Sequence, residues 1–129
     1  MREFLKELNG PQLEAVLHKD GPLMIVAGAG SGKTKVLTAR IAQLMAAHKV
    51  DAFNILALTF TNKAAKEMKE RVEKILGNNE ARNLYIGTFH SVFARILRGE
   101  AHRLGYPSNF TIYDTDDAKS VIKTVINEL

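Results

Sequence analysis

Residues 23–34 read LMIVAGAGSGKT, and this stretch decides the fold. A short all-apolar run predicts a strand at 23–27 that is buried on both faces. The glycines predict a turn that admits positive φ angles, and a helix is expected to begin near Gly32. A strand, a glycine-rich turn and a helix in this order are the context that a phosphate-binding loop requires.

The predicted turn has the chemistry of a nucleotide site. Successive backbone N–H groups form a nest for phosphate oxygens, and the dipole of the following helix favours an anion there. Lys33 can reach the β- and γ-phosphates, and the Thr34 hydroxyl can bind Mg²⁺. The strict pattern G-x-x-x-x-G-K-[ST] has glycine where this chain has Ala27, and we expect a small side chain to suffice there. The candidate nucleotide contacts in this stretch are Ala27, Gly28, Ala29, Gly30, Ser31, Gly32, Lys33 and Thr34.

The rest of the chain alternates strands with helices. Further strands are predicted at 54–60, 84–88 and 110–113, and helices at 11–18, 36–48, 62–76, 89–104 and 118–129. Such alternation predicts an α/β fold with a mainly parallel sheet covered by helices.

Composition limits the class of protein. The 129 residues suffice for one domain, and a hydrophobic share of 46% suffices for a core. The net charge of +4 is compatible with nucleic acid, and the lack of cysteine excludes disulfides and thiolate metal sites. Without a long apolar run or an apolar signal core, the sequence predicts a cytoplasmic protein with no membrane partner.

Four stretches resemble the UvrD/Rep/PcrA group of superfamily 1 DNA helicases. They are LNGPQLEAV (8–16), AGAGSGKT (27–34), ALTFTNKAAKEMKERV (57–72) and IGTFHSVFARILR (86–98). Their order and spacing agree with that group over essentially the whole chain, and Ala27 fits the form of the loop in that group. The resemblance implies a P-loop NTPase of the RecA-like type, a three-layer α/β/α fold that is incomplete here. Residues 1–129 would be the N-terminal part of the first RecA-like domain, ending before an inserted helical domain.

The resemblance also implies a function. It indicates a motor that uses ATP and Mg²⁺ to move 3′ to 5′ along single-stranded DNA and to unwind duplex at single-strand/duplex junctions. Gln12 matches the glutamine that reads the adenine edge, although a solvent-facing position in a short helix is the alternative. Lys33 matches the catalytic phosphate lysine, and Thr34 matches the Mg²⁺ ligand. Lys35 stands where the group often has arginine, and its contact with base or sugar stays open.

Two further stretches match DNA contacts of the group. Phe60, Thr61 and Asn62 follow the second predicted strand, where Phe60 could stack on a base. The alternative for Thr61 and Asn62 is helix N-capping, and the two roles are compatible. A second set, Thr88, Phe89 and His90, followed by Ser91, lies at the next junction of a strand and a helix.

The sequence offers no convincing set of groups for ATP hydrolysis. Asp114–Asp117 follow the predicted strand 110–113 and imitate an acidic metal site, but capping of the next helix explains them better. The resemblance places the acidic motif and the arginine finger in the remainder of the helicase chain. We therefore expect this fragment alone to be inactive and to self-associate or be marginally stable. A small P-loop kinase and a non-enzymatic nucleotide-binding module are the alternative functions.

Overall fold

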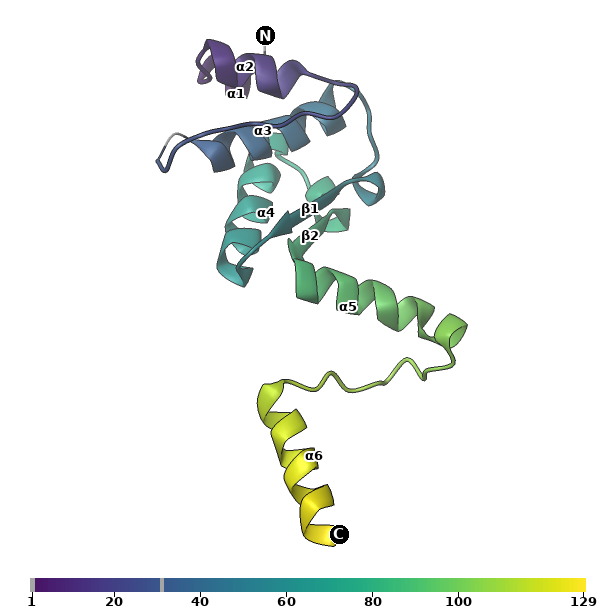
Figure 1. The fold of residues 1–129 in the computed structure, drawn as a ribbon. Coiled ribbons are helices and arrows are strands. Elements are labelled where there is room, and N and C mark those ends of the chain that lie inside the picture. Colours follow the sequence, from purple (N-terminus) through teal and green to yellow (C-terminus); the bar gives the residue numbers. More distant parts are fainter. Residues whose placement is uncertain (1, 31) are drawn as a thin grey trace. The chain divides into compact units, whose positions relative to one another are not determined.

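The computed structural model describes residues 2–30 and 32–129, which divide into two compact units, Met1–Val92 and Phe93–Leu129. Figure 1 shows the order of the elements along the chain. The first unit contains α1 (Glu3–Lys6), α2 (Gly10–Leu17), α3 (Lys33–Ala46), β1 (Leu56–Thr59), α4 (Asn62–Leu76) and β2 (Tyr85–Thr88), with the 3-10 turns η1 (Ala52–Asn54) and η2 (Glu80–Asn83). Helix α5 (Phe89–Glu100) crosses the boundary, and η3 (Ala101–Leu104) and α6 (Thr115–Glu128) complete the second unit.

The sheet of the described residues is a parallel pair. β1 pairs with β2 so that Leu56 lies opposite Tyr85 and Thr59 lies opposite Thr88. Helix α4 is the crossover between them, as parallel neighbours require. Both strands therefore end at the same edge of the sheet, where the residues that follow them can meet.

Local signals fix the ends of α4, and its predicted bounds of 62–76 are confirmed. The Thr61 hydroxyl caps the start by accepting a hydrogen bond from the Ala64 N–H at 3.1 Å. Gly77 ends the helix in the left-handed region with φ of 67°. The face with Ala65, Met68 and Val72 is buried.

Helix α3 packs into two hydrophobic clusters. Val36 and Ala39 join a cluster with Leu5 and Val16 from the N-terminal helices. A second cluster lies between α3, α4 and the sheet, and its buried members are Ile41, Met45, Ala52, Ile55, Met68, Val72, Ala81 and Leu84. Helix α3 therefore connects the N-terminal helices with α4 and the sheet (Figure 1).

Two predicted strands are wrong. Residues 23–27 and 110–113 are irregular, and neither pairs with another strand among the described residues. Met24 and Val26 have exposed fractions of 85% and 89%, whereas a strand in the middle of a sheet would bury both. An apolar run favours a strand only when a neighbour supplies the ladder hydrogen bonds, and these two segments have none.

The second unit shows what replaces the expected strand at 110–113. The Arg98 guanidinium donates to the Ser108 and Phe110 carbonyls, both at 3.0 Å, and lies 4.6 Å from the centroid of the Phe110 ring. Phe110 is thus fixed to helix α5 through a cation rather than through a strand partner. Helix α6 forms as predicted, but its apolar stripe, which includes Val121 and Val125, is exposed.

Among the described residues, no helix combines the length and the apolar character needed to cross a bilayer.

Candidate functional site

The glycine-rich turn has the backbone that the sequence predicts. Gly30 and Gly32 have φ angles of 75° and 81°, in the region that side chains disfavour. Gly32 is the N-cap of α3, and its cap has no side-chain hydrogen bond. The first turn of α3 has no acidic residue, and Lys33 and Thr34 are exposed there. Backbone donors, a helix dipole and a cation are therefore presented together at this helix start.

Other predicted nucleotide contacts lie in the loop before Gly32. Gly28 and Ala29 are exposed, and Ala27 is half-buried. Ser31, also predicted to contact nucleotide, lies outside the described residues.

Gln12 lies beside this turn although it is far from it in sequence. A Cβ atom built on Gly32 would lie 3.0 Å from Gln12 Nε2. Gln12 is the third residue of α2 and forms a capping box with Asn9: the Asn9 N–H donates to Gln12 Oε1 at 3.1 Å, and the Gln12 N–H donates to Asn9 Oδ1 at 3.0 Å. Gln12 is half-buried and adjoins the loop, and its contact with adenine stays a prediction.

The Lys35 side chain contacts the chain that precedes α2. Its ammonium donates to the Glu7 carbonyl at 2.9 Å and lies 3.6 Å from the Glu7 carboxylate. These contacts link α3 to the chain just before α2. A contact between Lys35 and nucleotide stays a prediction.

The two predicted DNA-contact sets meet at the carboxyl edge of the sheet. Phe60 follows β1 with an exposed fraction of 93%, and Phe89 begins α5 directly after β2. Their ring centroids are 6.1 Å apart with a tilt of 37°. Two aromatic rings at one sheet edge offer flat surface on which a base could stack.

Polar groups flank this aromatic pair. Thr61 caps α4 as described, and Asn62 is the first residue of that helix. The Thr88 hydroxyl donates to Ser91 Oγ at 2.9 Å and accepts from the Ser91 N–H at 3.1 Å, which caps the start of α5. His90 and Asn62 are exposed beside two helix N-termini, where backbone donors favour a phosphate.

The acids after residue 113 have a structural role. Asp114 is the N-cap of α6 and forms a capping box with Asp117, whose N–H donates to Asp114 Oδ1 at 2.8 Å. This backbone hydrogen bond holds the pKa of Asp114 below its ordinary value. The described residues contain no group of three or more histidine, cysteine or acidic side chains that could hold a metal ion.

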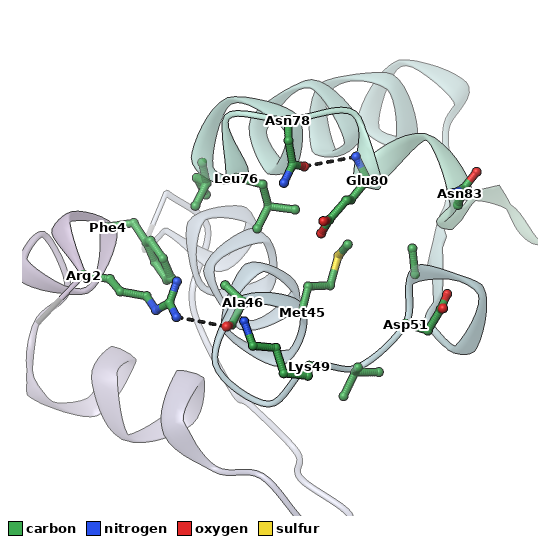
Figure 2. A pocket seen from close by; sticks show the side chains of 13 residues that line it. Arg2, Phe4, Met45, Ala46, Lys49, Asp51, Leu76, Asn78, Glu80 and Asn83 are labelled. Carbon is green, nitrogen blue, oxygen red and sulfur yellow. Dashed lines mark hydrogen bonds between the residues drawn. The ribbon is translucent and has the colours of Figure 1, made fainter.

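A separate cavity of about 560 Å³ lies at the other ends of α3 and α4, and its lining includes no residue of the glycine-rich turn (Figure 2). There the Arg2 guanidinium donates to the Ala46 carbonyl at 2.9 Å, and Asn78 Oδ1 accepts from the Glu80 N–H at 3.0 Å. Arg2 thus supplies the positive charge that the C-terminus of α3 favours. This contact and the similar one from Arg40 to α2 could not be predicted from the sequence, because cation–carbonyl bonds leave no periodic signal.

Comparison with known proteins shows the family to which the chain belongs. The family model described as UvrD/REP helicase N-terminal domain matches residues 8–129. The chain is 56% identical over 126 residues to the ATP-dependent DNA helicase PcrA of Staphylococcus epidermidis, and 55% identical over 126 residues to that of Staphylococcus aureus. In both cases the match covers 98% of this chain and 17% of the helicase, so the chain spans about a sixth of the length of these relatives. The chain belongs to the UvrD/REP helicase N-terminal domain family.

Proposed function

We propose that this chain is the ATP-binding N-terminal part of an ATP-dependent DNA helicase, with a RecA-like P-loop fold. The observation that carries the proposal is the start of α3. The phosphate site would consist of the left-handed Gly32 cap and the exposed Lys33. The group that would read the base is the nearby Gln12 amide. A small kinase would need the phosphate site, but its reaction would not require the exposed aromatic pair at the sheet edge.

The residues present fit ATP with Mg²⁺. The backbone donors of the loop and Lys33 would hold the phosphates, and the Thr34 hydroxyl would be one ligand of the metal. Gln12 would pair with the adenine edge through its amide. Mg²⁺ bound there would neutralise phosphate charge.

Titration with ATP tests this site. We expect Lys33→Ala to weaken binding at least about tenfold, because a desolvated charge-assisted contact with phosphate is worth about 1.5–3 kcal/mol. Lys123→Ala is the matched control, since Lys123 is an exposed lysine on α6 in the other unit. Equal ATP affinity of wild type and Lys33→Ala would remove the basis of the proposal.

The sheet edge is the proposed single-stranded DNA contact. Phe60 and Phe89 would stack on bases. The phosphates of the DNA backbone would contact the exposed side chains of Asn62 and His90, and also the helix starts near Thr61 and Thr88. Loss of one stacking side chain is worth about 1–3 kcal/mol, so we expect Phe60→Ala to weaken DNA binding about tenfold. Phe53→Ala is the control, because Phe53 is an exposed phenylalanine (60%) on η1 rather than at this edge. Equal losses in the two variants would contradict the assignment, and binding should also weaken steeply with salt.

The activity of the whole protein is a further part of the proposal. The two relatives are named ATP-dependent DNA helicases, and we propose the same activity, with 3′ to 5′ movement, for the complete protein. The acidic metal ligand and the arginine finger would come from outside this chain, so we expect no measurable ATP turnover by residues 1–129 alone. Measurable turnover would refute that expectation.

We also propose that the remainder of the protein supplies strands beside residues 23–27. Leu23, Met24, Ile25 and Val26 are all exposed here, and a row of apolar residues with unpaired backbone groups favours association. The chain alone should therefore self-associate or be marginally stable. A stable monomer in sedimentation, with a high melting temperature, would contradict this.

A further inference from the structure

Helix α2 carries Gln12, and a side chain of α3 holds the other end of that helix. Arg40 Nη1 donates to the Ala15 carbonyl at 2.8 Å and also to the His18 carbonyl. Ala15 lies in the last turn of α2 and His18 is its C-cap. The last turn of α2 has no basic residue of its own, so Arg40 supplies the positive charge that a helix C-terminus favours.

A second contact from α3 fixes the chain before α2. Lys35 Nζ donates to the Glu7 carbonyl at 2.9 Å. The two cations of α3 therefore bracket α2, one before its first residue and one at its end. Helix α3 itself begins at the glycine-rich turn, and Arg40 lies about 10 Å along it from Lys33 at ~1.5 Å per residue.

The Gln12 amide has a defined orientation within this arrangement. Its oxygen accepts from the Asn9 N–H, and its nitrogen lies toward Gly32. Adenine presents the N7 acceptor beside the N6 donor, whereas guanine presents the two acceptors N7 and O6. An amide whose oxygen is held by the Asn9 N–H and whose nitrogen lies toward the loop matches adenine and leaves its oxygen facing an acceptor on guanine.

We propose that Arg40 is a positioning residue for base recognition: by holding α2 against α3, it sets the Gln12 amide at the distance from the loop that favours adenine over guanine. This inference rests on the proposed nucleotide site. Arg40 acts through Gln12 and the α2 backbone. Its loss should therefore change the preference for adenine over guanine rather than the binding of the phosphates. Small displacements of a positioned group have large effects, which makes that choice a sensitive readout.

The experiment measures dissociation constants for ATP and for GTP on residues 1–129. Arg40→Met keeps the apolar stem but removes both hydrogen bonds, and we expect the preference for ATP over GTP to fall about fivefold or more. Arg40→Lys should restore most of the preference, because an ammonium can donate to both carbonyls. Arg2→Met is the matched control: Arg2 makes the same kind of bond to the Ala46 carbonyl at the far end of α3, and its loss should leave the preference unchanged.

The outcomes separate this inference from the nucleotide site itself. Partial unfolding lowers the apparent affinity for both nucleotides by the same factor, so the ATP-to-GTP ratio is interpretable even in a destabilised variant. An unchanged ratio in Arg40→Met, or the same fall in Arg2→Met, would overturn the positioning role. A wild type that binds both nucleotides equally would overturn it as well. Failure of the nucleotide site would instead appear as an ATP affinity that Lys33→Ala leaves unaltered.

Discussion

Gly32→Ala is the substitution that tests the geometry of the loop most directly. Gly32 has φ of 81°, and the left-handed region costs an L-residue about 1–2 kcal/mol. The new Cβ would also lie 3.0 Å from Gln12 Nε2, an atom that must move a few tenths of an ångström while its amide is held by Asn9. Helix α3 cannot rotate to relieve the strain, because both hydrophobic clusters hold it.

The expected loss of stability follows from these terms. Conformational strain and contact together amount to about 2–3 kcal/mol, and the lower entropy of alanine in the unfolded chain offsets about 0.4–1 kcal/mol. We therefore expect Gly32→Ala to lower the free energy of unfolding by about 1–2.5 kcal/mol. For a domain of this size the melting temperature should fall by roughly 4–10 °C.

Two glycines of the same turn are matched controls. Gly30 has φ of 75° but open space around its Cβ position, so Gly30→Ala tests strain without contact and should lose less than about 1 kcal/mol, since the exposed turn can relax. Gly28 has no positive φ, and a Cβ atom built on it would meet nothing within 4 Å, so Gly28→Ala should be neutral or slightly stabilising. Urea denaturation followed by circular dichroism at 222 nm ranks the variants. If Gly32→Ala is as stable as Gly28→Ala, the described loop conformation is wrong.

Three other predictions concern helix ends and the core. Thr61→Ala should destabilise the first unit by about 1 kcal/mol through loss of the α4 cap, whereas Thr61→Ser should retain most of it; equal urea midpoints would contradict the cap. The Gln43 side chain is buried and its Oε1 has no hydrogen-bond partner among the described residues, so Gln43→Met should leave the melting temperature unchanged or raise it, and a clear fall would indicate a partner for that oxygen. The Asp114 pKa is lower in the folded state than in the unfolded state, so its capping of α6 is fully present above the unfolded value of about 3.8 and is lost as pH falls through the folded value. Helical ellipticity should therefore decrease at acid pH in wild type and less so in Asp114→Asn, which keeps a capping oxygen; identical acid titrations would contradict the role.

The helices were predictable because the signals that form them are local. Thr61 and Gly77 lie next to the ends of α4 that they fix, and a period of 3.6 residues marks the buried face between them. Strands are different, because the hydrogen bonds that define them come from another segment. Within the predicted strands 54–60 and 84–88, β1 and β2 form and pair with each other. Residues 23–27 are just as apolar, but they pair with no other strand among the described residues. The same reasoning explains the failure at 110–113, where the Phe110 carbonyl accepts from Arg98 instead.

The candidate site divides along the same line. The glycines of the turn predicted a backbone that admits positive φ angles, which Gly30 and Gly32 adopt and Gly28 does not, although the strand expected before the turn is absent from the described residues. The parallel order of two strands was enough to bring Phe60 to Phe89. The hydrogen bonds that hold α2 against α3 do not correspond to any short sequence pattern. They join Lys35 to Glu7 and Arg40 to Ala15, across 28 and 25 residues of chain, and their acceptors are backbone carbonyls that any residue type provides. Motif matching therefore finds the groups that would touch the nucleotide, whereas the groups that would aim them are found only from the three-dimensional arrangement.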